Sequence, residues 1–308
     1  MTPSAMRGDG KTGGNTHSHR HTSPKRSKLH FTGGGSYDIF QRARFQPVCD
    51  HLSMTGPRDA GRAREWDALS YDRVGAHMAH RGAGVLERIE LRGSETVLDA
   101  GCGTGRVTAQ VLERLPAGRV IALDGSTAML DRARERLGGD PRVHFIRADL
   151  TEPLALTEAV DVIVSTSTLH WVPDHAGVFR RFADALNPGG RLHVDCGGAG
   201  NITGVQDAIR AAGVTWSPWN FRSDAQARAD LEAAGFAEIA TWLSHDPFEL
   251  DRRDLKEYLR TVVLGSHLER LGEAAGQLFL DAVADAMPAP IIDYVRLNID
   301  AVAGPTPP

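Results

Sequence analysis

The sequence predicts an α/β fold: a doubly wound sheet of seven strands, mostly parallel, with an additional helical lid. Three observations predict this fold. Between residues 95 and 195, short apolar runs alternate with segments of helical periodicity, and this alternation implies parallel crossovers with helices on both faces of a sheet. The first apolar run ends in a glycine-rich turn at 101–105. The last run, Tyr294–Val302, alternates apolar and polar residues, as a strand with one exposed face does.

Strands are expected where apolar runs are short and bounded by glycine, proline or charged residues. The first five are expected at Glu95–Gly101, Arg119–Asp124, Arg142–Arg147, Val160–Ser165 and Gly190–Asp195. A sixth strand is expected at Ala237–Leu243. The alternating segment Tyr294–Val302 is the seventh, and its polar alternate residues predict an exposed or edge position in the sheet.

Helices are expected where apolar residues recur at three to five positions. Such spacing fills Gly61–Glu90, before the first strand, and residues 252–287, before the last one. The helices between the strands are expected at Val107–Leu115, Ser126–Leu137, Ala176–Leu186 and Asp224–Ala234. Ser126 is placed to cap the second of these, and Gly138 and Gly139 are placed to end it.

The charge divides the chain into two unequal parts. Residues 1–53 hold eight Lys/Arg and three Asp, a net of +5, so the remaining 27 basic and 36 acidic residues carry −9. Residues 1–60 have few apolar groups to bury and predict a disordered basic leader. We expect residues 61–303 to form one folded domain and residues 304–308 to form a tail. Met54 precedes the first helical segment, which raises the hypothesis that translation starts there.

Composition excludes several classes of protein. No run of eighteen apolar residues is present, so no membrane-spanning helix is expected, and the first residues lack the apolar core of a secretory signal. The three cysteines, Cys49, Cys102 and Cys196, are far apart and suggest neither a disulfide framework nor a metal site. His17, His19 and His21 lack cysteine or carboxylate partners, so no metal is expected. A reducing, cytoplasmic setting is therefore predicted.

The glycine-rich turn Val97–Gly105 predicts a ligand-binding loop. Glycines at alternating positions let the backbone turn and approach a ligand closely. The dinucleotide pattern starting at Gly101 requires glycine at 106, where this chain has arginine. The phosphate-binding pattern of nucleotide hydrolases also fails, because no lysine and hydroxyl residue follow the last glycine. A dehydrogenase is therefore disfavoured.

Two carboxylates follow the next two strands. Asp124 ends the second strand, where a carboxylate can accept both hydroxyls of a ribose. Asp149 follows the third strand and can accept from an adenine amino group. Because ligands of open α/β sheets bind outside the carboxyl ends of the strands, the loop and both carboxylates predict an adenosine site at that edge.

These residues resemble a known family. Val97–Gly105, Asp124, Ala148-Asp149 and the Asn187–Gly190 turn look like motifs of class I S-adenosylmethionine-dependent methyltransferases, over roughly residues 62–303. The resemblance implies the Rossmann-like fold of that family, with the last strand antiparallel, and S-adenosylmethionine as cofactor. It also implies that the methionine end is held by Asp99, Gly101, Cys102, Gly103 and Gly105, the adenosine by Asp124, Gly125, Met129, Asp149 and Leu150, and the methyl side by Ser165.

The segment Asp161–His175 carries a finer resemblance. It looks like the corresponding stretch of trans-aconitate methyltransferases, and is similar to malonyl-carrier-protein and quinone methyltransferases. The first two groups modify carboxyl oxygens, so the resemblance implies a small-molecule acceptor and favours a carboxylate oxygen. A carbon or oxygen of a quinone or natural-product intermediate is the alternative. An alternative to an enzyme is a noncatalytic protein that binds S-adenosylmethionine.

The acceptor determines whether a base is needed. A carboxylate is ionised at neutral pH, whereas a hydroxyl, amine or acidic carbon needs a base, most naturally histidine. His170 follows the fourth strand and is the candidate base or substrate contact; a structural histidine is the alternative. Trp171 either walls the substrate or only packs. Tyr71, with His77 and His80, either faces the substrate or lies on a solvated helix face.

Three segments predict the lid: 61–90, 197–222 and 252–287. The second is too long for a plain connection, and Trp216 and Trp219 in it suggest an apolar cover, with or without substrate contact. Arg222 either clamps an acid or lies exposed. A nucleic-acid acceptor is disfavoured, because the part after residue 53 is acidic and no Asn/Asp-Pro-Pro-aromatic stretch follows the fourth strand. The sequence leaves the oligomeric state open.

Overall fold

The structure is a computed structural model that describes residues 64–74 and 84–305. The predicted leader at 1–60 lies outside the described residues, as do Met54, His77 and His80. The predicted helical segment 61–90 lies partly within them: residues 64–67 have no regular structure, helix α2 is Ala68–Val74, and 84–87 are helical.

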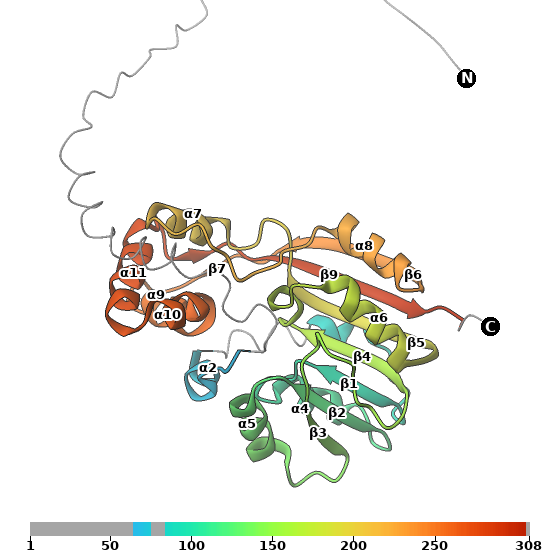
Figure 1. Cartoon of the computed structure of the whole chain (residues 1–308). Helices are drawn as coiled ribbons and strands as arrows, with labels where there is room; N and C mark the ends of the chain where they lie inside the picture. The colour runs from blue at the N-terminus through green and yellow to red at the C-terminus, as the bar shows by residue number, and fades with distance from the viewer. Residues whose placement is uncertain (1–63, 75–83, 306–308) are drawn as a thin grey trace, which may run out of the picture. The chain divides into compact units, whose positions relative to one another are not determined.

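A seven-stranded sheet in the order β3-β2-β1-β4-β5-β9-β6 forms the core of the described residues (Figure 1). The pairs β3–β2, β2–β1, β1–β4 and β4–β5 are parallel, whereas β9 is antiparallel to both β5 and β6. The predicted fold class is thus confirmed. The strands are β1 Thr96–Ala100, β2 Arg119–Asp124, β3 Val143–Arg147, β4 Val160–Thr166, β5 Leu186–Gly197, β6 Phe236–His245 and β9 Val295–Ala303.

Helices cover both faces of the sheet because the central strands are apolar on both sides. Alternate residues of β1 enter different core clusters: Leu98 packs with α6 and α8, and Val97 packs with α4. Leu130 of α5 joins Ala122 on the same face as α4. These helices are α4 Arg106–Glu113, α5 Thr127–Leu137, α6 His175–Ala185 and α8 Asp224–Ala233. The Ser126 hydroxyl accepts from the Met129 N–H, which confirms the predicted cap of α5.

The position predicted for the last strand is wrong. β9 lies inside the sheet, between β5 and β6, and its polar residues Arg296 and Asn298 are buried. Each has a polar partner: Arg296 pairs with Asp195, and Asn298 receives a hydrogen bond from Arg88 and donates one to Ser244. The alternating polar residues of β9 therefore form buried hydrogen bonds and do not mark a solvent-exposed face of the strand.

A separate group of helices lies beyond the carboxyl ends of the parallel strands, on the left of Figure 1. The helices α7, α9 and α11 and the π-helix η2 share one apolar core, and α10 packs on α11. The elements are α7 Thr203–Ala211, α9 Leu255–Tyr258, η2 Leu259–Val263, α10 Gly265–Leu271 and α11 Glu273–Ala286, with a two-stranded sheet of β7 Phe248–Glu249 and β8 Ile291–Ile292. We call these five helices the helical cluster.

The prediction of helices over 252–287 is confirmed, and Gly272, with a φ of +74°, separates α10 from α11. Two local predictions needed correction. The segment 197–222 is not only loop, because it contains α7. Strand β5 begins at Leu186 and so includes the predicted Asn187–Gly190 turn. Among the described residues, no helix is long and apolar enough to cross a membrane.

Candidate active site

A cavity of about 810 Å³ opens between the carboxyl ends of the parallel strands and the helical cluster. Gly101 follows β1, Asp124 ends β2 and Thr166 ends β4, and all three line it. The opposite wall includes Val262 and Val263 of η2 and Ser266 of α10. The site therefore lies where open α/β sheets bind their ligands. The residues that the structure describes contain no cluster of metal ligands.

The glycine loop is held against the second strand. The amides of Gly101 and Cys102 both donate to the carbonyl of Leu123, at 2.8 and 2.9 Å. A Cβ on Gly101 would lie 2.2 Å from the Thr168 side chain, so no side chain fits there. Gly103 has a φ of +54°, and no atom lies within 4 Å of the place where its Cβ would be. The loop therefore packs tightly at Gly101 and presents open backbone at Gly103.

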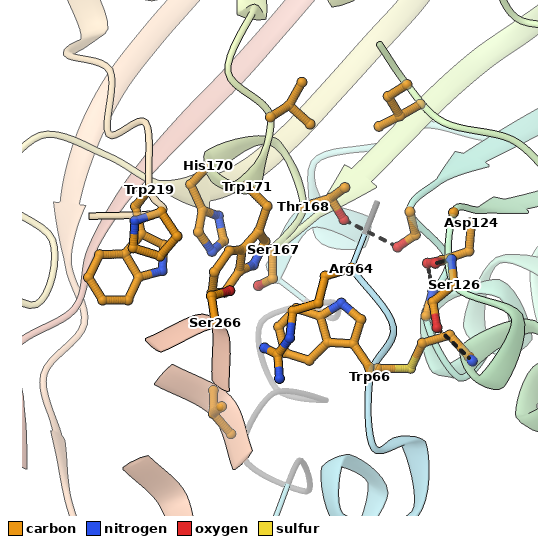
Figure 2. Close-up of a pocket in the computed structure, with 18 of the residues that line it drawn as sticks. Arg64, Trp66, Asp124, Ser126, Ser167, Thr168, His170, Trp171, Trp219 and Ser266 are labelled. Atoms are coloured by element: carbon orange, nitrogen blue, oxygen red, sulfur yellow. Dashed lines mark hydrogen bonds between the residues drawn. The ribbon is translucent and has the colours of Figure 1, made fainter. Parts of the chain in front are cut away.

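Asp124 is fixed in place by backbone amides. Its Oδ2 accepts from Gly103 N and its Oδ1 from Ser126 N, at 2.9 and 2.8 Å (Figure 2). A carboxylate has about four acceptor positions, so each oxygen keeps one for a ligand hydroxyl. Burial raises the pKa of Asp124, and the nearby Glu65 charge adds to the rise, although the amides of Ser126 and Gly103 oppose it. The geometry suits two neighbouring hydroxyls of a ribose.

The remaining residues predicted to hold adenosine also line the cavity. They are Gly125, Met129, Asp149 and Leu150. Met129 and Leu150 are buried and apolar, as a wall for an adenine ring requires. The Oδ1 atom of Asp149 accepts from the Thr151 hydroxyl and amide, at 2.7 and 2.9 Å, which orients the carboxylate.

Five predicted residues lie outside the cavity lining: Asp99, Cys102, Gly105, Ser165 and Arg222. Asp99 is fully buried, its Oδ2 accepts from the Thr108 hydroxyl at 2.6 Å, and burial raises its pKa to about 7. The Ser165 hydroxyl donates to the Ala100 carbonyl at 2.7 Å. Arg222 forms an ion pair with Asp230. The partners of Asp99 and Ser165 are thus Thr108 and Ala100, and Arg222 does not line the cavity.

Aromatic rings line the other end of the cavity, which we call the acceptor end. Trp171 lies edge-on to Trp66, with centroids 5.2 Å apart, and 6.0 Å from Trp219. Trp219 stacks on Phe221 at 5.7 Å. Figure 2 shows these tryptophans around the space below His170. Of the other predicted substrate residues, Tyr71 and Trp216 also line the cavity. The walls of the acceptor end are therefore largely aromatic.

His170 is held between this wall and the sheet. Its ring stacks on Phe221 at 5.9 Å, and its Nδ1 accepts a hydrogen bond from Gly197 N at 3.2 Å. The side chain is 9% exposed and lines the cavity. The predicted residue is thus at the acceptor end, with one ring nitrogen engaged by the backbone.

A buried ion pair supports the loop after β4. Arg296 donates to Asp195 from Nε at 3.0 Å and to the Ser167 hydroxyl from Nη2 at 2.9 Å. Ser167 also donates its N–H to the Asp195 carbonyl at 2.7 Å and has a φ of +54°. A non-glycine residue in this conformation is strained. The contacts with β5 and β9 hold it there.

Three arginines line the acceptor end: Arg64, Arg270 and Arg296. Arg64 donates from Nε to Glu269 at 2.6 Å and stacks over Trp66, and its Nη1 is buried with no hydrogen-bond partner among the described residues. Arg270 lies over the Trp216 ring at 4.8 Å. Glu269 is the carboxylate partner of Arg64, and Asp195 is that of Arg296.

Helix α2 ties the glycine loop to the rest of the site through Asp72. Its carboxylate accepts from the Thr104 hydroxyl at 2.8 Å and pairs with Arg106, Arg132 and Arg136. Burial alone would raise the pKa of Asp72, but these hydrogen bonds and charges lower it to about 2. Asp72 is therefore ionised at neutral pH and fixes α2 against the loop and α5.

Sequence reasoning missed several residues of the acceptor end. They are Arg64, Trp66, Ser167, Phe221, Arg270 and Arg296. Ser167 had a signal, because it lies in the polar Ser-Thr-Ser-Thr stretch directly after the fourth strand. Arg296 was hidden by the assumption that the polar residues of the last strand face solvent. The others come from distant segments and needed the fold.

The residues at the cofactor end fit S-adenosylmethionine. The open backbone at Gly103 leaves room for close approach, and Asp124 presents acceptors for a ribose. Met129 and Leu150 provide apolar surface and Asp149 a carboxylate for the adenine. We expect these residues to hold the adenosine, with Gly101 and Gly103 beside the methionine part.

A family model and several known proteins are similar to this chain. A family model described as a methyltransferase domain matches residues 97–190. Trans-aconitate 2-methyltransferase of Azoarcus sp. (strain BH72) is 30% identical over 246 residues, covering 75% of this chain and 94% of the relative. The enzyme of the same name from Acidovorax ebreus (strain TPSY) is 39% identical over 130 residues, or 42% of this chain, and the match spans about half of that relative, 49%.

Solved structures share the fold. Phosphoethanolamine N-methyltransferase 2 of Haemonchus contortus, in complex with S-adenosylhomocysteine, gives a TM-score of 0.53 at 18% identity, over 78% of this chain and 57% of that chain. The cyclase SpnF also gives 0.53, at 20% identity, over 86% and 95%. The fold alone thus does not fix the reaction. The Azoarcus relative is matched over nearly its whole length, and on that evidence the chain belongs to the class I S-adenosylmethionine-dependent methyltransferases.

Proposed function

We propose that this chain methylates a carboxylate oxygen of a small organic acid. The observation that carries the proposal is that three arginines, Arg64, Arg270 and Arg296, line the acceptor end of the cavity. Arginine is the side chain best suited to bind carboxylates, since its planar fork of N–H groups matches both oxygens. Arg64 Nη1, buried without a partner among the described residues, is a donor that such an acid would satisfy.

The chain's own residues would bind and orient the two reactants. When bound, S-adenosylmethionine supplies a methyl group on a sulfonium; the acceptor oxygen bonds to the methyl carbon as the carbon–sulfur bond breaks, leaving a thioether. Alignment of the reactants is then the main requirement. Asp124 would hold the ribose, and the walls of Trp66, Trp171 and Trp219 would exclude water from the acceptor.

The names of the relatives suggest which acid to try first. The Azoarcus and Acidovorax proteins are trans-aconitate 2-methyltransferases. An unsaturated tricarboxylic acid suits an end with three arginines, because one carboxylate can accept the methyl while the others pair with guanidinium groups. We therefore infer trans-aconitate or a closely similar acid. The acidic excess after residue 53 supports a small molecule over a nucleic acid as acceptor.

The test is product identification with the full-length chain. The protein is incubated with S-adenosylmethionine and trans-aconitate, and the products are separated and weighed by mass spectrometry. The expected product is a monomethyl ester, which releases methanol in alkali. Cis-aconitate and citrate are compared in parallel. Absence of any ester across these acids would overturn the proposal.

A quinone or natural-product acceptor is the second candidate. The rings of Trp66, Trp171, Trp219 and Phe221 favour it, since they can stack on an aromatic acceptor. The same assay with a naphthohydroquinone distinguishes the two, because a methyl on ring carbon or phenolic oxygen resists alkaline hydrolysis.

A further inference from the structure

The hydrogen bond to Nδ1 fixes the proton on the His170 ring. Gly197 N is a donor only, so the Nδ1 atom that faces it at 3.2 Å is the acceptor and carries no proton. A neutral imidazole has one donor and one acceptor nitrogen. The proton of neutral His170 therefore lies on Nε2. The stack on Phe221 and the hydrogen bond from Asn220 N to the His170 carbonyl keep the residue in this position.

Ser167 is oriented by its neighbours in a comparable way. Arg296 has no acceptor atoms, so the Ser167 oxygen must accept from Nη2, and the hydroxyl proton points elsewhere. The residue lines the cavity just before the 3-10 helix Leu169–Trp171, which holds His170, and Figure 2 shows both side chains facing the space that Arg64 and Trp66 border. The strained φ of +54° is maintained by Asp195 and Arg296, which indicates that the direction of this side chain matters.

We propose that His170 and Ser167 are a pair of neutral hydrogen-bond donors for the accepting carboxylate, and that His170 is not a general base. Arg296 acts through Ser167 and is a positioning residue. This inference rests on the proposed function. A carboxylate and a sulfonium give a neutral ester and a neutral thioether, so no proton leaves the acceptor and no base is required. A base would need an unprotonated Nε2, which would leave Gly197 N facing a protonated Nδ1.

Two substitutions separate a donor from a base at His170. The amide nitrogen of glutamine in His170→Gln can reach the place of Nε2, which restores a donor that cannot act as a base. The shorter His170→Asn can still accept from Gly197 N but cannot reach the place of Nε2. A donor role predicts that glutamine is the better replacement, a base predicts that both fail, and a structural role predicts that asparagine is at least as good.

The experiment measures kcat and KM for trans-aconitate with the full-length variants. We expect His170→Asn to lower kcat/KM about 10- to 100-fold, the effect of losing a hydrogen bond to a charged group. His170→Gln should stay within about fivefold of the wild type, and affinity for S-adenosylhomocysteine should change little in both. Ser167→Ala keeps the Cβ, and therefore the backbone strain, and should cost about tenfold. The exposed His144→Gln is the control and should have wild-type activity.

The pH profile gives an independent readout. For the wild type we expect kcat to be flat between about pH 6 and 9, because no histidine must lose a proton. Equal loss of activity in His170→Gln and His170→Asn would overturn the donor assignment. A kcat that rises with pH as a histidine loses its proton would overturn it too.

The tautomer can be tested without a substrate. Nitrogen-15 chemical shifts of the ring, assigned with His170→Gln, should identify Nδ1 as unprotonated and Nε2 as protonated. Protonated Nδ1 would overturn this inference while leaving the proposed function standing. A wild-type chain with the expected tautomer that methylates no acid would overturn the proposed function instead.

Discussion

Asp124 is the residue on which cofactor affinity should depend most. Both of its oxygens are held by backbone amides and each keeps an acceptor position. We expect Asp124→Asn to weaken binding of S-adenosylhomocysteine about 10- to 100-fold, because hydrogen bonds to charged groups contribute about 1.5–3 kcal/mol. Isothermal titration calorimetry measures the change.

The matched control for Asp124 is Asp131→Asn. Asp131 lies on the neighbouring helix α5, where it pairs with Arg134 and is 62% exposed. Its replacement should leave the affinity unchanged. An unaltered dissociation constant in Asp124→Asn would remove Asp124 from the binding site.

At the scale of single residues, local pattern was enough to place Asp124, Asp149, Gly101 and Gly103 at the cavity, whereas several residues of the acceptor end were missed. Asp124, Asp149 and the glycines lie next to strands in the chain, so local pattern and the rule for parallel sheets were enough to bring them together. Arg64, Arg270 and Arg296 come from the segment before α2, from α10 and from β9, and they line one cavity only because the fold brings these segments together. No local pattern records that convergence.

Helix α10 carries a histidine that should make stability depend on pH. His267 is fully buried between the rings of Trp216, Trp219 and Phe279, and its Nε2 donates to the Trp216 carbonyl at 3.2 Å. Burial lowers the pKa of His267 to about 4, and Arg270 and Arg64 add to the lowering. The helical cluster therefore folds around a neutral imidazole.

The consequence is a loss of stability in mild acid. The pKa is lower in the folded chain than in the unfolded chain, so the neutral ring contributes fully above about pH 6.5, and the contribution is lost as pH falls toward 4. From pH 7 to pH 5 the free energy of unfolding should fall by about 2 kcal/mol from this group. Urea unfolding of wild type and His267→Phe at both pH values measures it. The variant should lose less than the wild type between them, and equal losses would contradict the assignment.

The boundaries of the helices show why the apolar periodicity of the sequence predicted them only in part. The helix at 127–137 was predicted closely because its cap, Ser126, and its end, Gly138, are local signals. The segment 252–287 was predicted to be helical without boundaries inside it, and the structure places the end of α10 and the start of α11 on either side of Gly272. Periodicity reports which residues are buried, but it does not report where the chain turns.

For the whole molecule, the Arg296–Asp195 pair links the sheet to the acceptor end. Both side chains are largely buried, 3% and 10% exposed. We expect Asp195→Asn to lower the free energy of unfolding by about 3 kcal/mol, because removing one partner leaves a buried charge without its counterion. Urea unfolding measures the loss.

A double variant tests the reason. Asp195→Leu with Arg296→Met replaces the pair by apolar groups and should recover most of the stability, while the positioning of Ser167, and with it activity, stays lost. The exposed pair Arg210–Asp207 gives the comparison, since Asp207→Asn should change stability by less than about 0.5 kcal/mol. Equal effects at the two carboxylates would show that burial of the pair is unimportant.

The interior position of β9 has a consequence for the order of folding. Arg191 of β5 pairs with Val302, 111 residues later in the chain, and β6 reaches the sheet only through β9. The backbone groups at the edge of β5 therefore stay unpaired until the helical cluster and β9 have been synthesised. Pairings of such long sequence separation close slowly, and an open strand edge invites association with other chains meanwhile. Refolding yield should thus fall with protein concentration.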